Sequence, residues 1–285
     1  MAAMWSLIIS LLFLLLPIAP SSSIKFLLEG NVYPVGHFYA TLNIGEPAKP
    51  YFLDVDTGSN LTWLECDHPV NGCKGCHPRP PHPYYKPAAD KLKVQCGGPL
   101  CAAVRRDVPG IPECSRKDPH RCHYEIKYVT GKSEGDLARC GYNQEEPADA
   151  PPSSVDGILG LGRGKAGFAA QLKGLKMITE NVIGHCLSSK GKGVLYVGDF
   201  NPPSRGVTWV PMSYYSPGLA ELFIDKQPIR GNPTFEAVFD SGTTYTFVPA
   251  QIYNELVSKV IITCRGEGSC SASMLEREKA IQICQ

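Results

Sequence analysis

Short runs of alternating hydrophobic and polar residues recur along most of the chain, and turn-forming residues separate them. The clearest run covers residues 37–44, and a second run, 51–55, leads directly into Asp56. Because alternation places successive side chains on opposite faces of an extended chain, each run predicts a half-buried strand. Runs of the same kind lie at 61–64, 123–130, 193–198, 206–211 and 236–239.

Two segments have apolar residues at helical spacing instead. They are residues 166–175 and 249–262, and in the second Ile252 and Leu256 share one face behind a helix-starting Pro249. Many short strands with isolated helices, rather than alternating strands and helices, predict a mostly β fold. The 28 glycines and 25 prolines among 285 residues fit such a turn-rich protein.

The N-terminal segment differs from the rest of the chain. Residues 5–16 are almost wholly apolar, and Pro17 and a stretch of small residues follow them. The apolar run is short for a membrane span and fits the hydrophobic part of a secretory signal peptide. We therefore expect residues 1–23 to be a cleaved signal, the alternative being an uncleaved anchor.

Charge and cysteine content narrow the class of protein. A formal net charge of +1 favours neither nucleic acid nor an acidic membrane as a partner. The chain has 12 cysteines, and in an exported protein these predict disulfides. Many of them fall in 66–122, which we interpret as an insertion of disulfide-held loops. The alternative there is a zinc site at Cys73 and Cys76, but no second pair of ligands has zinc-finger spacing.

Two short motifs carry the candidate chemistry. Asp56-Thr-Gly-Ser and Asp240-Ser-Gly-Thr each follow an apolar run, in two distant parts of the chain. A single copy of such a motif would indicate only an ordinary turn, since Asp accepts backbone N–H groups and Gly supplies a positive φ angle. Two copies in the same context indicate a duplicated lobe, each half presenting one carboxylate.

A pair of carboxylates can hydrolyse peptides without a metal. The reaction needs an activated water and a proton donor. Two carboxyls held close together share one proton, so that the charged member polarises the water and the protonated member donates. We expect Gly58 and Gly242 to let backbone amides approach the carboxylates.

Five stretches support a resemblance to a known family: GNVYPVGHFY at 30–39, FLDVDTGS at 52–59, CGYNQ at 140–144, DGILGLGRG at 156–164 and VFDSG at 238–242. Together they resemble the pepsin-like aspartic proteases, and within them the plant nucellin-like branch. The resemblance covers nearly all of the chain after the signal. It implies a mostly β, two-lobed fold with a substrate-binding cleft.

The resemblance also implies a role for each motif residue. Asp56 and Asp240 match the catalytic pair. Thr57 and Ser241 match residues that cross-link the two loops, and the hydroxyls of two further residues bond the carboxylates. The full set of loop-supporting residues is Thr57, Gly58, Ser59, Ser241, Gly242 and Thr243.

Other site residues follow from the same resemblance. Tyr128 matches the tyrosine of a flap over the cleft, and Trp63 the tryptophan behind it; the alternatives are an ordinary cross-strand tyrosine and a core tryptophan. The 158–160 stretch resembles a support for the first loop. We interpret Asp54 as structural, on the opposite pleat from Asp56. Asn60 is a glycosylation sequon that we expect to be unmodified, because it adjoins the loop.

The chain departs from the family pattern in two places. After residues 135–138 the flap lacks its usual continuation, so we expect a shortened flap. Only 45 residues follow Asp240, and a second apolar-apolar-Gly support is absent. We therefore expect an N-terminal lobe at 24–208 and a truncated C-terminal lobe at 209–285. Residues 24–30 leave little room for a pro-segment.

These observations predict a secreted aspartic endopeptidase, active in acid, that resides outside the cell or in the vacuole. We expect polypeptide substrates, a monomer, no cofactor, no metal, and no nucleic-acid or membrane partner after signal cleavage. The alternative is a catalytically impaired relative that binds a peptide or protein, which the incomplete second lobe favours.

Overall fold

The computed structural model describes residues 23–32, 35–65, 82–83, 85, 94–108, 114, 120–128, 132–137, 140–143, 154–188, 191–199, 208–213, 216–224, 226–229 and 234–267. The structural statements below concern these residues. The expected signal up to residue 22, Cys73, Cys76 and the flap tip at 129–131 lie outside them.

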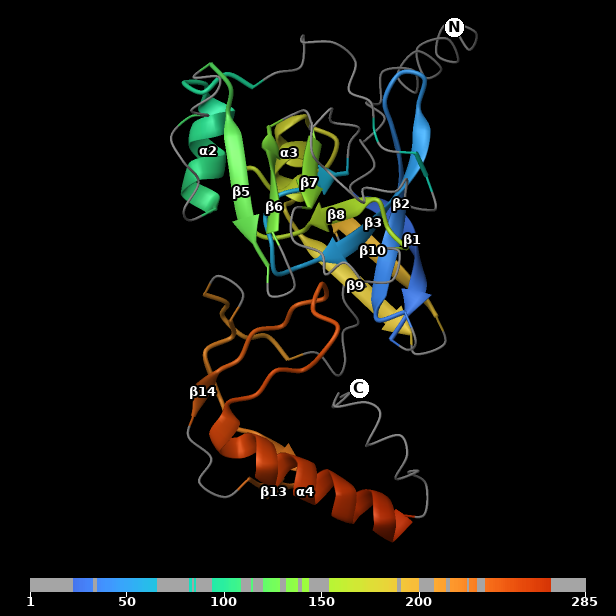
Figure 1. Cartoon of the computed structure of the whole chain (residues 1–285), viewed down its shortest axis with the longest axis vertical. Coiled ribbons are helices and arrows are strands. Elements are labelled where there is room, and N and C mark those ends of the chain that lie inside the picture. The colour runs from blue at the N-terminus through green and yellow to red at the C-terminus, as the bar shows by residue number, and fades with distance from the viewer. Residues whose placement is uncertain are drawn as a thin grey trace, which may run out of the picture.

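A seven-stranded sheet with the order β4-β8-β3-β2-β1-β10-β9 is the largest sheet among the described residues (Figure 1). Neighbouring strands run antiparallel apart from β3 and β8, which are parallel. The strands are β1 (Ser23–Asn31), β2 (His37–Ile44), β3 (Lys49–Asp56), β4 (Trp63–Leu64), β8 (Gly157–Gly160), β9 (Ile183–Ser188) and β10 (Lys192–Gly198).

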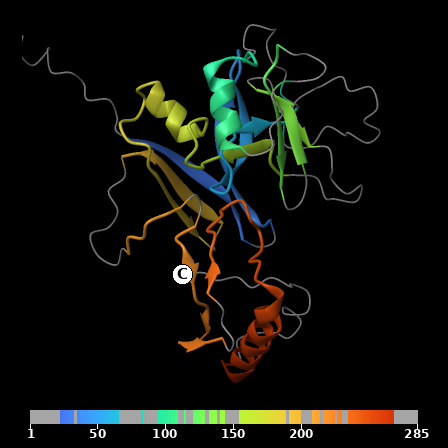
Figure 2. The ribbon, with the colours of Figure 1, turned by 90° about the vertical axis from the view of Figure 1, so that its left-hand side faces the viewer.

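A second, three-stranded sheet carries the flap region. Its strands β5 (His123–Lys127), β6 (Lys132–Asp136) and β7 (Cys140–Asn143) pair in that order. Two helices accompany the sheets, α2 (Pro99–Asp107) and α3 (Phe168–Gly174). Figure 2 shows the same elements turned about the vertical axis, with the C-terminal elements set apart from the two sheets.

The C-terminal elements form a smaller unit below the large sheet in Figure 1. Two strand pairs and one long helix make up this unit. They are β11 (Leu219–Ala220) with β14 (Phe235–Glu236), β12 (Phe223–Ile224) with β13 (Gln227–Pro228), and α4 (Ala250–Glu267).

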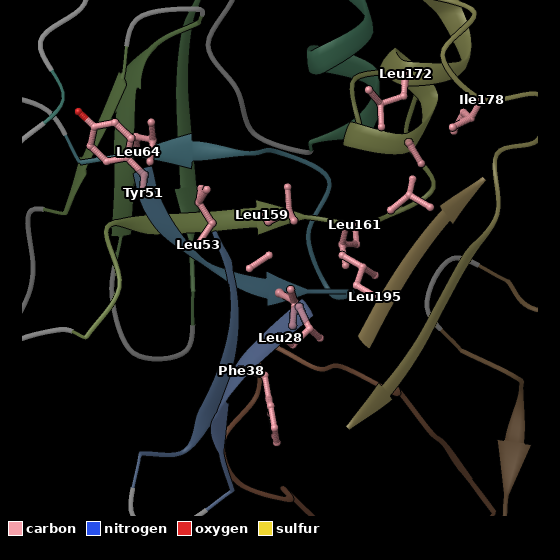
Figure 3. Close-up of a cluster of buried hydrophobic side chains, with 14 residues drawn as sticks. Leu28, Phe38, Tyr51, Leu53, Leu64, Leu159, Leu161, Leu172, Ile178 and Leu195 are labelled. Atoms are coloured by element: carbon pink, nitrogen blue, oxygen red, sulfur yellow. The ribbon is translucent and has the colours of Figure 1, made fainter. Parts of the chain in front are cut away.

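The largest core lies on one face of the seven-stranded sheet, as Figure 3 shows. Strand β3 contributes every second residue to it: Tyr51, Leu53 and Val55 are all buried. Leu159 of β8 and Leu195 of β10 are also fully buried there. This alternation fixes the orientation of β3, and with it the face on which the remaining residues of the strand lie.

A second core joins the other face of the sheet to α2 and β5. Trp63, Val104 and Tyr124 are buried in it. Two disulfides hold the surrounding chain, Cys96–Cys114 and Cys101–Cys122. The prediction of a disulfide-held insertion is thus confirmed for this part of it, although the segment also contains a helix.

The smaller unit has a thin core. Ile229, Ile252 and Leu256 are buried together, with the two α4 residues on the face that the sequence predicted. Many large apolar side chains of this unit remain exposed, among them Trp209, Leu219, Phe223, Val238, Phe239, Tyr245 and Phe247.

Most predicted elements are present, with several differences. The strand predicted at 206–211 is wrong in its described part, since residues 208–211 form no strand. Strands β1, β7 and β9 and helix α2 were not predicted. α2 did have signals, a proline in its first turn and Arg105 and Arg106 in its last. Within the described residues, none of the helices combines the length and apolar character of a membrane span.

Candidate active site

The first Asp loop, residues 56–59, is held in place by strand pairing. Asp56 is the last residue of β3, and the parallel strand β8 places Gly160 beside it. The Asp56 carbonyl accepts a hydrogen bond from the Leu161 N–H at 2.8 Å. A Cβ on Gly160 would lie 2.5 Å from the Leu61 carbonyl oxygen, so a larger residue would push the loop away. The 158–160 stretch therefore supports the loop as the sequence suggested.

The Asp56 carboxylate is buried, with 4% of its surface exposed, and is oriented by its own loop. Its Oδ1 accepts a hydrogen bond from the Gly58 N–H at 2.8 Å. Its Oδ2 accepts one from the Ser59 hydroxyl. Both oxygens thus have a fixed direction before any substrate binds.

The second Asp loop, residues 240–243, repeats this geometry. The Asp240 Oδ1 accepts a hydrogen bond from the Gly242 N–H at 2.9 Å, and its Oδ2 accepts one from the Thr243 hydroxyl at 2.6 Å. The surroundings differ, because Asp240 is only half-buried and the preceding Val238 and Phe239 are 59% and 70% exposed. The two loops have the same internal bonds, but only the Asp56 loop is enclosed by a core.

Four hydrogen bonds join the two loops reciprocally. The Thr57 N–H donates to the Ser241 hydroxyl at 3.1 Å, and the Ser241 N–H donates to the Thr57 hydroxyl at 2.9 Å. Each hydroxyl then donates across to the residue before the opposite Asp, Thr57 to the Phe239 carbonyl at 3.3 Å and Ser241 to the Val55 carbonyl at 2.6 Å. The loops therefore form one approximately symmetric unit.

Each loop glycine lies against the Asp of the opposite loop. A Cβ on Gly58 would lie 2.5 Å from Oδ2 of Asp240, and a Cβ on Gly242 would lie 2.7 Å from Oδ1 of Asp56. Both distances are well inside van der Waals contact, so any larger residue would separate the carboxyls. The sequence suggested a need for glycine from backbone approach alone and did not foresee this cross-loop contact.

The pKa of Asp56 is raised to about 6. Burial is the largest cause, and the charge and hydrogen bond of Asp240 raise it further, whereas the bonds from Ser59 and Gly58 act in the opposite direction. A carboxyl pair in this environment holds a proton at pH 4 to 5, where isolated carboxyls are mostly ionised. The arrangement can therefore supply a proton donor and a carboxylate together.

Tyr128 and Trp63 lie together beside the first loop. The Trp63 Nε1–H donates to the Tyr128 hydroxyl at 2.9 Å, and Ser59 is a second hydrogen-bond partner of that hydroxyl. The pKa of Tyr128 is raised to about 12, chiefly by burial and also by the charges of Asp56 and Asp240. Tyr128 is thus close enough to Asp56 and Asp240 for their charges to act on its hydroxyl.

Two further polar groups hold the first loop, and the sequence analysis did not assign them this role. The Asn60 side chain donates to the Asp107 carbonyl at 2.8 Å and accepts from the Gly164 N–H at 3.0 Å. The Asp107 carboxylate accepts from the Ala166 N–H at 2.9 Å. Because both ends of the Asn60 amide are engaged, its sequon is unsuited to glycosylation, in line with the expectation.

A third polar side chain, Asp156, lies directly before β8. Its Oδ2 accepts a hydrogen bond from the Phe52 N–H at 2.6 Å and lies 2.8 Å from Nδ1 of His82. It therefore ties the beginning of β8 to β3. The available signal was its position directly before Gly157-Ile-Leu-Gly.

The expected position of Asp54 was wrong. A period of two places residues 54 and 56 on the same face of β3, while Leu53 and Val55 point into the core on the other. The charges of Asp56 and Asp240 act on the Asp54 carboxyl, which agrees with this placement. Asp54 therefore belongs to the same cluster of carboxyls.

All the active-site residues that the sequence singled out lie in the described part of the chain, and the structure brings them together. Within that part, groups of three or more metal-binding side chains are not found. The candidate zinc ligands Cys73 and Cys76 fall outside it. His82, which lies near them in sequence, is engaged by Asp156 instead.

Comparison with known proteins gives a consistent result. The family model described as "Xylanase inhibitor N-terminal" matches residues 38–139 and 139–199. The two matched segments meet at residue 139, where the sequence indicated a shortened flap. The structure nevertheless forms the third strand β7 directly after this point.

One curated relative aligns with the whole chain, and a second aligns with most of it. An aspartic proteinase of Oryza sativa subsp. indica is 43% identical over 309 aligned positions, which include 100% of this chain and 73% of the relative. Aspartic proteinase 36 of Arabidopsis thaliana is 26% identical over 267 positions, covering 79% of this chain and 53% of the relative.

Solved structures share the fold. An aspartic proteinase from Irpex lacteus superposes with a TM-score of 0.53 at 14% identity, covering 83% of this chain and 68% of that one. Basic 7S globulin from soybean gives a TM-score of 0.52 with the same identity and coverage. The family model and the relative that is 43% identical show that the chain belongs to the pepsin-like aspartic protease family, and the solved structures share its fold.

Proposed function

We propose that this chain is an aspartic endopeptidase in which Asp56 and Asp240 form the catalytic pair. The observation that carries the proposal is the reciprocal hydrogen bonding of Thr57 and Ser241, which holds two equivalent Asp loops face to face. A joint of this kind fixes the two carboxyls relative to each other, and a pair of oriented carboxyls is the requirement of metal-free peptide hydrolysis.

The mechanism follows from the charge of the pair. In acid the pair carries one proton, consistent with the raised pKa of Asp56. The ionised carboxyl removes a proton from a water molecule as that water attacks the peptide carbonyl carbon, and the protonated carboxyl donates to the carbonyl oxygen. The carboxyl that took the water proton then gives it to the amide nitrogen, while the other carboxyl takes a proton from a hydroxyl of the tetrahedral diol, and the C–N bond breaks to leave a carboxylic acid and an amine. The pair ends with one proton, ready for another cycle.

The remaining residues support this chemistry. Gly58 and Gly242 permit close approach of the carboxyls, and Ser59 and Thr243 orient their outer oxygens. We assign Tyr128 to a flap that covers the bound peptide, with Trp63 holding its hydroxyl. The flap tip itself is outside the described residues.

Cleavage of a denatured protein near pH 4, with and without a statine-type inhibitor, tests the proposal. Asp56→Asn and Asp240→Asn should each abolish inhibitor-sensitive cleavage. Asp199→Asn, a carboxyl of the same residue type bonded to Thr179 away from the loops, is the matched control and should retain it. Absence of inhibitor-sensitive cleavage by a well-folded chain would contradict the proposal.

Location and organisation form part of the same proposal. We assign residues 1–23 to a cleaved signal, 24–208 to the N-terminal lobe and 209–285 to a partial C-terminal lobe, within the plant nucellin-like branch. The two disulfides support passage through an oxidising compartment, and hence an extracellular or vacuolar location. Polypeptides are the substrates, and the chain acts as a monomer.

A specific observation favours a second candidate, a protein that binds without cleaving. The matching family model is described by the name of a xylanase inhibitor, and the Asp240 loop is flanked by exposed apolar residues. Titration against a purified xylanase and against a statine-type peptide separates the candidates. Binding that survives the Asp56→Asn, Asp240→Asn double change, with no cleavage by the unchanged chain, would favour this second function.

A further inference from the structure

Asp54 is a third carboxyl beside the Asp56–Asp240 pair, and the proposed mechanism does not use it. It lies two residues before Asp56 on the same face of β3. The residue keeps some exposed surface, but its Oδ1 atom is shielded from solvent and has no hydrogen-bond partner among the described residues. A shielded carboxylate oxygen without a partner is costly, whereas a neutral carboxylic acid in the same place costs far less.

The neighbours of Asp54 do not offset a negative charge. Across β2 it is paired with Tyr39, whose hydroxyl donates to Glu29 instead. Across β8 it is paired with the apolar Ile158. In the described part of the chain, no ion pair involves Asp54 or either carboxyl of the pair.

The next charged groups along this face are also occupied. Phe52, on the same face, stacks on Tyr39 with ring centroids 4.6 Å apart and meets His82 in a T-shaped contact at 4.7 Å. His82 is held by the Asp156 carboxylate. The charges that reach Asp54 are those of Asp56 and Asp240, and both are negative.

These surroundings favour the protonated form of Asp54. Its pKa is raised well above the usual value, first by burial and then by the charges of Asp56 and Asp240, while a hydrogen bond from the Val55 backbone acts in the opposite direction. Asp54 therefore stays neutral in the acid range in which the pair would hold its shared proton.

We propose that Asp54 is a positioning residue that must remain protonated, and that its ionisation ends the pH range in which the two Asp loops stay locked together. The inference deepens the proposed function, because it rests on Asp56 and Asp240 acting as a proton-sharing pair. Loss of the Asp54 proton to solvent adds a further negative charge beside the pair, and the resulting repulsion opposes the contact between the loops.

The direction of the pH effect follows from linkage. A carboxyl whose pKa is higher in the folded than in the unfolded chain stabilises the fold fully below the unfolded pKa, about 4. That stability is lost as the pH rises from there through the folded pKa. The contribution of Asp54 is therefore present in acid and absent in alkali.

The test compares thermal unfolding of the full chain and of Asp54→Asn between pH 4 and pH 8. Asparagine has nearly the same shape and cannot ionise, so the variant should gain in Tm relative to the unchanged chain as the pH rises, by about 3 °C or more. Asp56 and Asp240 are present in both proteins, so the difference reports the ionisation of Asp54 together with its repulsion by those two carboxyls. Asp54→Ser, also neutral and smaller, serves if the asparagine variant does not fold.

Asp136→Asn is the matched control with the opposite sign. Burial favours the neutral form of Asp136, but hydrogen bonds from His123 and Arg121 outweigh it, so its pKa is lowered. This variant should therefore lose Tm at neutral pH relative to the unchanged chain. Infrared difference spectra of the unchanged chain minus Asp54→Asn at pH 5 should also contain the band of a neutral carboxylic acid.

Parallel Tm profiles for the unchanged chain and Asp54→Asn, or a carboxylate band at pH 5, would overturn the inference. Neither measurement needs turnover, so the outcome is separable from that of the proposed function. A chain that cleaves no peptide but shows the growing Tm difference contradicts the protease proposal and supports the role of Asp54 at the joint. A cleaving chain with parallel profiles does the reverse.

Discussion

At the scale of single residues, the site depends on small groups in contact across the two loops. Gly58 and Gly242 leave room for the opposite carboxyl, and Thr57 and Ser241 exchange hydrogen bonds. The residue types were predictable from the two motifs. The resemblance implied that Thr57 and Ser241 cross-link the loops, but the individual donors and acceptors and the contact of each glycine with the opposite carboxyl were not predictable, because the motifs are far apart in sequence.

Gly58→Ala should disrupt the pair without disrupting the fold. Its Cβ would overlap the Asp240 carboxyl at 2.5 Å and force the loops apart. A displacement of this kind costs about 100-fold in activity. Gly97→Ala is the control, since a Cβ there meets nothing within 4 Å. Assays of kcat with thermal unfolding of both variants check the prediction; equal activities would contradict it.

The pH dependence of activity should reflect the Asp56 proton. With the pKa of Asp56 at about 6, the pair loses its shared proton as the pH rises through that value, so kcat/KM should fall above about pH 6. Protonated Asp56 also stabilises the fold, and this contribution is complete below about pH 4 and is lost as the pH rises through about 6. A rise in pKa from 3.8 to about 6 corresponds to roughly 3 kcal/mol of unfolding free energy. A pH–rate profile measures the first effect, and activity that persists unchanged to pH 8 would contradict it.

At the scale of elements, α2 and the 162–167 turn hold the first loop through side chains. Asn60 and Asp107 connect these segments to the residues that follow Asp56. The alternating strands β2, β3 and β10 were predicted because their period is visible locally. α2 was missed because cysteines and prolines around it suggested loops, and β1 because its pairing with β10 is a long-range contact.

Asp107→Ala should lower stability by about 1–3 kcal/mol, because it leaves the Ala166 N–H without its acceptor. The substitution should also weaken cleavage, since the turn that it releases bonds to Asn60 beside the first loop. Arg106→Gln, exposed on the same helix, should change stability little. Urea denaturation of the three proteins provides the measurement. Similar losses for both variants would argue against the Asp107 contact.

At the scale of the whole molecule, the two parts are unequally enclosed. The seven-stranded sheet has cores on both faces, whereas the C-terminal unit has a few buried residues and many exposed apolar ones. This chain aligns with 73% of the length of the relative from Oryza sativa subsp. indica. The Asp56 and Asp240 loops thus join a well-packed part to a thinly packed one.

Ile252→Ala should destabilise the C-terminal unit locally. The residue is 1% exposed, and removing a buried isoleucine side chain costs about 2–5 kcal/mol. Hydrogen exchange should quicken in 219–267 and change little in 23–199. Leu53→Ala, equally buried in the large sheet, should give the reverse pattern. Equal changes in both regions would show that the molecule unfolds as one unit.

The sequence by itself determined the strand pattern and the two Asp motifs, because alternation and turn chemistry are local properties. The period of two that puts Asp54 and Asp56 on one face of a strand is local as well, so the expected placement of Asp54 on the opposite face was an error of interpretation. Only the tertiary structure decided the disulfide pairs, the reciprocal loop bonds and the raised pKa of Asp56. These depend on which distant segments meet and on how much solvent their contact excludes.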